Sequence, residues 1–126
     1  MRAVFTEKDC YTFSPEQLDK PNIAFFVARQ DTKSVGCVAL LKHHDYGEVK
    51  RLFVPKIARG LGIAETLMSH VESHAQTAGL RLIRLETGAK LTAAVALYQK
   101  LGYKECNPFG GYSSNPASLF MEKYPV

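Results

Sequence analysis

The chain has 126 residues, which is enough for one domain with a hydrophobic core and too few for two. Its apolar share of 46% and charged share of 22% are ordinary for a globular protein, and no apolar run is long enough to cross a bilayer. The net charge of +4 excludes little by itself, because it suits an anionic ligand, nucleic acid or neither.

The cysteines and the first residues indicate a reducing compartment. Cys10, Cys37 and Cys106 are scattered without close pairs, which argues against a disulfide framework. The first ten residues contain no long apolar segment of the kind that a secretory signal requires. We therefore expect a cytoplasmic protein with free thiols.

The first half of the chain predicts a short helix followed by three antiparallel strands. Ser14-Pro15-Glu16-Gln17 has the residues of a helix start, with Ser as N-cap and Gln closing a capping box, and Pro21 limits its length. Three β-branched and apolar segments follow, at residues 23–29, 35–41 and 48–54. We expect the first two to pair as a hairpin, and Pro55 to stop the third.

A helical period replaces the strand pattern after the third strand. Apolar residues keep helical spacing from Ala64 to Ala78, and Gly79 is a typical C-terminal stop. Residues 80–86 then predict a strand. The order strand, helix, strand predicts a parallel pair with a right-handed crossover.

A second helix and two closing strands are expected in the last third of the chain. Thr92 is expected to cap a helix over residues 93–101, which ends at Gly102. The closing strands are expected at 103–106 and 118–123, with a loop rich in Gly, Pro, Asn and Ser between them. Together the elements predict an α/β fold with a mixed sheet.

Two glycines precede the longer helix, in the segment RGLGIA from Arg59 to Ala64. The first N–H groups of a helix have no intrahelical partner and carry the positive end of the helix dipole. Gly60 and Gly62 leave these groups accessible to an anion, and a guanidinium at Arg59 suits phosphate oxygens. The segment has neither the third glycine of a Rossmann fingerprint nor the Lys-Ser/Thr of a P-loop, so a tight strand-to-helix turn is the alternative.

In its context this segment resembles motif A of the GNAT superfamily of N-acetyltransferases, written Q/R-x-x-G-x-G/A. The strand EVKRLFVP precedes it and the amphipathic helix follows it. A second block, RLIRLETG and then AVALYQKLGY, is similar to the family's A-x-x-L-Y-x-K-x-G-F/Y segment. The tail NPFGGYSSNPASLFMEK resembles that of small bacterial members. The resemblance spans about residues 23–123 and implies a mixed, mostly antiparallel sheet with a central splayed pair of parallel strands flanked by helices.

This resemblance implies one domain over residues 1–126, with an acetyl-CoA-binding core at 48–79. The pantetheine arm is expected to pair with the backbone of one splayed strand, and the pyrophosphate to bind the glycine loop. The cofactor-binding residues that it implies are Leu52, Phe53, Val54, Arg59, Gly60, Leu61, Gly62, Ile63, Ala64, Thr92 and Tyr98. Many members carry Asn where this chain has Thr92, so one contact to the pantetheine amides is expected to be missing.

The implied reaction is transfer of the acetyl group of acetyl-CoA to a primary amine by direct attack in a ternary complex. Tyr98 matches the family's tyrosine that acts as general acid toward the CoA sulfur, and packing of a helix aromatic is the alternative. Glu48 lies eleven residues before Arg59, the spacing at which several members carry a glutamate base. A solvated carboxylate at a strand edge is the alternative interpretation of Glu48.

The resemblance is weakest at the N-terminus. Residues 1–22 are expected to be a shortened N-terminal part, with the opening strand and first helix largely missing. Three consequences are possible for such a chain. A homodimer partner covers the gap, the cleft is unusually open, or activity is impaired. The alternative function is a GNAT-fold module that binds CoA or serves as an oligomeric scaffold without efficient catalysis. The acceptor is expected to be a small amine or a protein amine, and its identity stays open.

Other candidate sites are weaker. His70 and His74 lie four apart, but HVESH does not have the order H-E-x-x-H, so we expect a solvated helix face and no metal. His43-His44-Asp45 is expected to be a turn, without the serine or cysteine motif of a triad. The sequence contains neither a nucleic-acid-binding motif nor a membrane segment, so we expect neither nucleic acid nor a membrane as a partner.

Three aromatic residues of the last third have two interpretations. Phe109, Tyr112 and Phe120 are compatible with lining an acceptor pocket and equally with packing in the loop and core. Cys37, inside an apolar strand, is expected to pack in the core.

Overall fold

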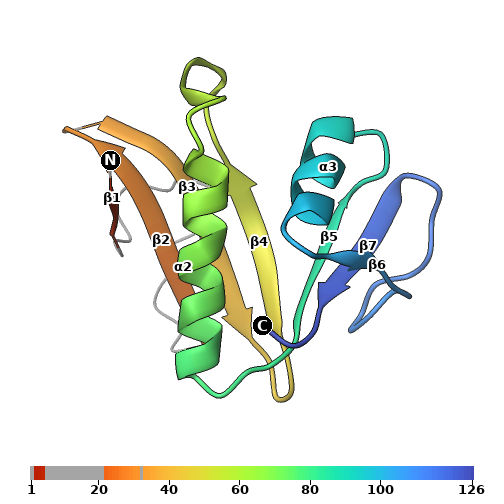
Figure 1. Ribbon diagram of the computed structural model, residues 1–126. Coiled ribbons are helices and arrows are strands. Elements are labelled where there is room, and N and C mark those ends of the chain that lie inside the picture. Colours follow the sequence, from red (N-terminus) through yellow and green to blue (C-terminus); the bar gives the residue numbers. More distant parts are fainter. Residues whose placement is uncertain (1, 5–21, 32) are drawn as a thin grey trace.

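The computed structural model describes residues 2–4, 22–31 and 33–126 (Figure 1). In chain order the elements are β1 (Arg2–Val4), β2 (Ile23–Gln30), β3 (Lys33–Lys42), β4 (Gly47–Phe53), the 3₁₀ turn η1 (Lys56–Ala58), α2 (Ile63–Thr77), β5 (Ile83–Gly88), α3 (Thr92–Lys100), β6 (Lys104–Glu105) and β7 (Ser118–Lys123). The strands form one sheet in the order β1-β2-β3-β4-β5-β7-β6. Among these described strands only β4 and β5 pair in parallel, which confirms the mixed, mostly antiparallel sheet.

Within the described residues, the predicted strands and helices are confirmed in order and type, and several ends differ. The β2–β3 hairpin and the closing strand β7 lie where the hydrophobic pattern placed them. Strand β5 begins at Ile83, three residues later than predicted, because the Leu80 N–H still donates to the Ala75 carbonyl and closes the end of α2. The turn η1 was not predicted.

The N-terminal prediction is partly corrected. Strand β1 pairs antiparallel with β2, so an opening strand is present where one was expected to be missing. A strand of three residues is too short for an alternating pattern to reveal it. The predicted helix start at Ser14-Pro15-Glu16-Gln17, and Cys10, lie outside the described residues.

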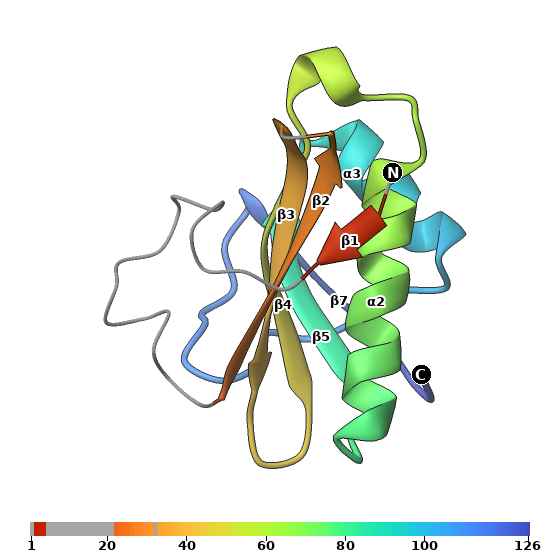
Figure 2. The same ribbon diagram turned by 90° about the vertical axis from the view of Figure 1, so that its left-hand side faces the viewer.

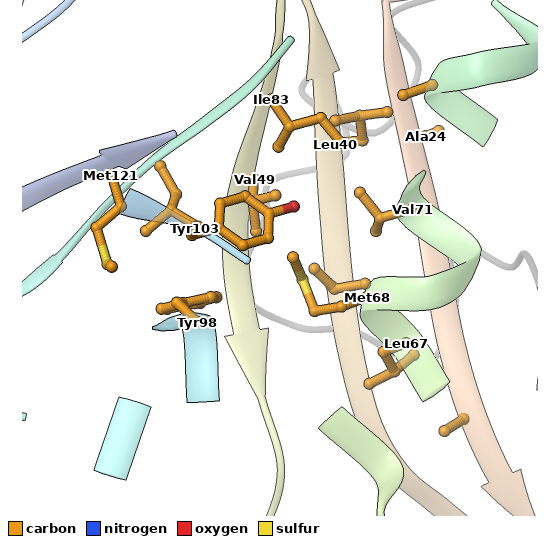
Figure 3. Packing of buried hydrophobic residues seen from close by; sticks show 14 of the residues in the cluster. Ala24, Leu40, Val49, Leu67, Met68, Val71, Ile83, Tyr98, Tyr103 and Met121 are labelled. Carbon is orange, nitrogen blue, oxygen red and sulfur yellow. The ribbon is translucent and has the colours of Figure 1, made fainter. Parts of the chain in front are cut away.

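Both described helices lie on the same side of the sheet (Figure 2). The buried face of α2 carries Leu67, Met68 and Val71, which belong to one hydrophobic cluster with Val49 of β4 and Leu85 of β5. Figure 3 shows Met68 and Leu67 on one side of this cluster and Tyr98 and Tyr103 on the other, with Val49 between them. Because strand residues alternate between faces, Glu48 and Lys50 leave β4 on the face away from the helices.

The opposite face of the sheet carries two smaller clusters. Phe25, Val27, Cys37 and Ala39 form one of them, which confirms that Cys37 packs in the core. The second contains Tyr46, Phe109 and Phe120, with Tyr112 packed against it. The segment between β6 and β7 therefore covers this face beside β5 and β7, on the side away from α2 (Figure 2).

Candidate active site

Strands β4 and β5 separate after a short ladder. They pair only between Gly47–Val49 and Ile83–Leu85, although both strands continue beyond it. Strand β4 has one extra residue opposite Cys37 and Ala39 of β3. Arg51, within this irregular stretch, has φ 60°. The extra residue makes this stretch of β4 a β-bulge. A bulge bends its strand, and in Figure 1 β4 and β5 diverge toward the end where α2 begins. The expected splayed pair is therefore confirmed.

A pocket of about 630 Å³ lies between the two separated strands. Strand β4 lines it with residues 48–52, and β5 lines it with residues 86–88. The remaining lining residues, from α3 and the C-terminal region, are Leu91, Ala94, Tyr98, Tyr112 and Ser118. We call this space the central pocket. Beyond Val49, the edge of β4 that faces it has no partner among the described strands, and such an edge can pair with an extended ligand.

A second, smaller hollow lies at the start of α2. It measures about 180 Å³ and is lined by Val54, Ala58, Arg59, Gly60, Gly62, Ile63, Ala64 and Glu65. We call it the glycine-loop hollow. Gly60 and Gly62 have φ 84° and 76°, in the left-handed region that favours glycine. A Cβ built on either glycine meets nothing within 4 Å, so these positions serve backbone conformation and access rather than packing.

The N-terminus of α2 has the features of an anion-binding helix end. Gly62 is the N-cap, and no side chain caps the first turn. The N–H groups of that turn therefore keep the partial positive charge of a helix end. Arg59 donates from Nε to the Val54 carbonyl at 3.2 Å and is exposed. Glu65, the acidic residue of the first turn, lies 3.4 Å from Lys100 Nζ, which offsets its charge.

Several of the predicted cosubstrate-binding residues line these two spaces, and they lie close together in the chain between β4 and α2. Leu52 lines the central pocket, Val54 lines the glycine-loop hollow, and Phe53 between them is 52% exposed. In the loop, Leu61 is exposed, whereas Ile63 is buried in the core at the start of α2. The stretch from β4 to the start of α2 thus borders both spaces.

The prediction that Thr92 caps α3 is wrong. Thr92 is the first residue of the helix, Leu91 is the N-cap, and no side chain caps it. The Thr92 N–H donates to the Lys90 carbonyl at 3.0 Å, so the turn before the helix already satisfies this group. Thr92 is exposed, and the central pocket is lined by Leu91 and Ala94 instead.

Tyr98 reaches the central pocket from the helix face of the sheet. It is 6% exposed and its ring meets the Tyr103 ring edge to face, with 5.9 Å between the ring centres (Figure 3). Burial raises the pKa of Tyr98 from its ordinary value of 10.0 to about 12. The phenol therefore stays protonated at neutral pH and is available as a donor.

Glu48 reaches the same pocket from the opposite face. It is the buried charged residue of the described chain, 4% exposed, so the alternative of a solvated carboxylate is wrong. Its Oε1 lies 2.9 Å from His43 Nε2, and Tyr112 donates its hydroxyl to Oε2 at 2.7 Å. Burial and this bond to Glu48 raise the pKa of Tyr112. The two partners hold the Glu48 carboxylate in one orientation at the pocket.

The two partners of Glu48 are candidate site residues that the sequence did not identify or left open. His43 was interpreted only as part of a turn, and Tyr112 had two interpretations. Tyr112 is 64 residues from Glu48 in the sequence, and its ring packs against Phe109 and Phe120. Glu86 of β5 adds a second carboxylate to the pocket and accepts a hydrogen bond from the Ser118 hydroxyl.

The histidines on α2 do not lie on a fully solvated face. His74 meets the Phe26 ring edge to face at 5.6 Å, and its Nε2 is buried without a hydrogen-bond partner. Burial lowers the pKa of His74 because the charged form loses solvent. His74, packed against Phe26 of β2, is thus half-buried, whereas His70 stays exposed. In the described part of the chain no three His, Cys, Asp or Glu side chains are grouped to hold a metal ion.

Comparison with known proteins decides the family. The model of the acetyltransferase (GNAT) family matches residues 2–103. The chain belongs to the GNAT family. An IAA acetyltransferase of Azospirillum brasilense is 46% identical over 110 residues, which cover 86% of this chain and 72% of that protein. This GNAT chain is thus related over most of its length to a protein named as an acetyltransferase.

Solved structures agree with the assignment. A Klebsiella pneumoniae protein assigned to the acyl-CoA N-acyltransferases superposes with a TM-score of 0.83 at 31% identity, covering 89% of this chain and 80% of that one. PaiA N-acetyltransferase of Thermoplasma acidophilum, solved in complex with coenzyme A, shares the fold, with a TM-score of 0.73, 23% identity and coverage of 82% and 61%. At the level of the family, the activity is acetyl-CoA-dependent acetylation. No helix in the described ranges is long and apolar enough to cross a membrane.

Proposed function

We propose that this GNAT chain transfers the acetyl group of acetyl-CoA to a primary amine, by direct attack in a ternary complex. One observation carries the proposal: Glu48 and Tyr98, both buried, reach the central pocket from opposite faces of the sheet where β4 and β5 separate. A proton acceptor and a proton donor on the two sides of one gap suit a reaction in which one group loses a proton and another gains one.

The residues around the gap suit acetyl-CoA as cosubstrate. The uncapped N-terminus of α2 with Gly60 and Gly62 offers amides to a pyrophosphate, and Arg59 adds a positive charge. The free edge of β4 at Leu52, Phe53 and Val54 offers main-chain groups to the pantetheine amides. When bound, acetyl-CoA supplies an acetyl group activated as a thioester. We propose that the binding core is residues 48–79 of a single domain.

Glu48 is proposed to accept the proton that the acceptor amine must lose, since alkyl amines are mostly protonated at neutral pH. Its two fixed partners keep the carboxylate oriented toward the pocket. Tyr98 is proposed to donate to the departing sulfur. With a pKa of about 12 against about 8.5 for a thiol, complete proton transfer from Tyr98 is uphill, so its main contribution is a hydrogen bond that stabilises the thiolate.

Thiol release from acetyl-CoA with a panel of amino acids, polyamines, aminoglycosides and peptides tests the proposal. We expect release that depends on an amine, and a loss of turnover of about 10²-fold or more in Glu48→Gln with CoA affinity retained. Glu86→Gln is the matched control, because it removes an exposed carboxylate from the same pocket. CoA binding without amine-dependent release would contradict the proposal and favour the alternative of a CoA-binding module. A homodimer stays a prediction, which the mass in solution tests.

A further inference from the structure

Lys50 places an ammonium group in the central pocket beside Glu48 and Tyr112, and we call this region the acceptor part. It follows Glu48 by two residues on β4, so both side chains leave the same face of the sheet. Its Nζ lies 3.9 Å from Glu48 Oε2 and 5.8 Å from the centre of the Tyr112 ring. The side chain is 37% exposed, in contrast to 6% for Glu48. The acceptor part therefore contains a cation beside the proposed base.

This cation is not needed to satisfy Glu48. Both carboxylate oxygens of Glu48 already have closer partners, His43 and Tyr112. A separation of 3.9 Å is too long for a hydrogen bond from Lys50. Within the described residues the ammonium group of Lys50 forms no hydrogen bond, and such a group has three donors. Because Lys50 lines the central pocket, these donors are available to a ligand that enters it.

Lys50 changes which amines are favourable. An acceptor that brings its nitrogen to Glu48 also brings it close to Lys50. A second cationic group on the acceptor, as in a polyamine, would then meet a like charge. An anionic group next to the amine would instead meet the free donors of Lys50, in a charge-assisted hydrogen bond.

The charges of the whole pocket agree with this. Glu48 and Glu86 are balanced by Lys50 and Arg51 among its lining residues, so the pocket is not the purely acidic surface that a polycation requires. The ring of Tyr112 adds apolar area for a side chain. We infer that the acceptor is a zwitterion with its carboxylate adjacent to its amine, as in a free amino acid, and that Lys50 binds that carboxylate. The inference rests on the proposed function, since it names the acceptor class of the same site.

Matched acceptors and matched variants test it. Each standard amino acid is compared with its C-terminal amide and with the amine left after removal of its carboxylate, at a pH where rates are corrected for the fraction of free amine. We expect the amino acid to give the higher kcat/KM. Lys50→Met should lower that kcat/KM by about 10- to 100-fold, mainly through KM, and leave the amide and the amine unchanged or improved. Lys33→Met is the control, because Lys33 is exposed at the start of β3, outside the pocket.

Binding provides a second readout that does not need turnover. In the presence of saturating CoA, titration calorimetry should detect the amino acid with the wild type and a weaker interaction with Lys50→Met. Binding of this kind without acetyl transfer would contradict the proposed function. It would leave intact the assignment of an amino acid as the ligand that Lys50 binds. A preference for the amide or the amine, an equal loss for all three acceptors in Lys50→Met, or no amino-acid binding would each overturn it.

Discussion

The glycine-loop hollow is built mostly from main chain, whereas the acceptor part of the central pocket is built from side chains. At the hollow, two glycines with positive φ and an uncapped helix end present backbone amides to solvent. At the acceptor part, a buried carboxylate is held by a histidine and a tyrosine, with a lysine beside it. In the proposed function, the first arrangement binds a group common to every catalytic cycle, and the second binds one class of acceptor.

The two regions also differ in how the chain assembles them. The hollow and the free edge of β4 come from one continuous stretch, residues 52–65. The acceptor part needs the turn that holds His43, the strand that holds Glu48 and Lys50, and the loop that holds Tyr112. A main-chain site survives changes of side chain as long as its dihedral angles are kept. A side-chain site can change its specificity by one substitution.

The largest expected effect is at the main-chain site. Gly62→Glu should weaken CoA binding by at least about 100-fold, because a carboxylate enters the anion position and like charges in contact cost several kcal/mol. Titration calorimetry with CoA measures this. Steric overlap contributes little, since a Cβ at Gly62 has open space.

Gly79→Glu is the matched control for this substitution. Gly79 also has a positive φ, 82°, and open space, but it lies beyond the other end of α2. Both variants therefore carry a similar backbone strain of about 1–2 kcal/mol and the same added charge. Full CoA affinity in Gly62→Glu, or an equal loss in both variants, would remove the hollow from the binding site.

An effect on turnover rather than on binding is expected at Tyr98. Tyr98→Phe should keep CoA affinity and slow turnover by about 10²-fold, because the donor to the leaving sulfur is lost. Since burial raises the pKa of Tyr98 to about 12, the wild-type hydroxyl stays protonated as the pH rises. The ratio of the two turnover rates should thus stay constant from about pH 7 to about pH 10.

Tyr103→Phe separates chemistry from packing. Tyr103 contacts Tyr98 and donates its hydroxyl to Glu72 at 3.0 Å, away from the central pocket. Loss of the Tyr103 hydroxyl should lower the free energy of unfolding by about 1–3 kcal/mol and leave the rate of transfer per folded molecule unchanged. If both phenylalanine variants slow turnover equally, Tyr98 acts through packing and the donor role is lost.

The same difference between main chain and side chains explains how much the sequence could predict. The helix α2, the glycine loop before it and the parallel pair around it depend on a local period and on local dihedral angles, and these were predicted. The bulge with Arg51 at positive φ was not predicted, because nothing in the residue type indicates a bulge there. Thr92 was expected to be a cap on residue type alone, while the hydrogen bonds of the preceding turn moved the helix start onto it.

The candidate site divides in the same way. Glu48 and Tyr98 were proposed from family motifs, but the burial of Glu48 and its two partners follow from long-range packing. The bond from Tyr112 depends on the loop between β6 and β7 folding over the sheet and placing the rings of Phe109 and Phe120 beneath it. No local pattern encodes a contact between residues 64 positions apart.

The smallest effect that we predict is at this long-range contact. Tyr112→Phe keeps the ring packing and removes one hydroxyl, so Glu48 loses the donor to Oε2 and keeps His43 at Oε1. We expect stability to fall by about 1–3 kcal/mol, since a buried carboxylate is left partly unsatisfied. Turnover should fall only a few-fold, because His43 still orients the base. Chemical denaturation and thiol release measure the two quantities on the same sample, with Tyr124→Phe, at an exposed tyrosine, as control. A loss as large as that of Glu48→Gln would mean that Tyr112 itself takes part in the chemistry, and the acceptor part would then have two essential side chains in place of one base with its supports.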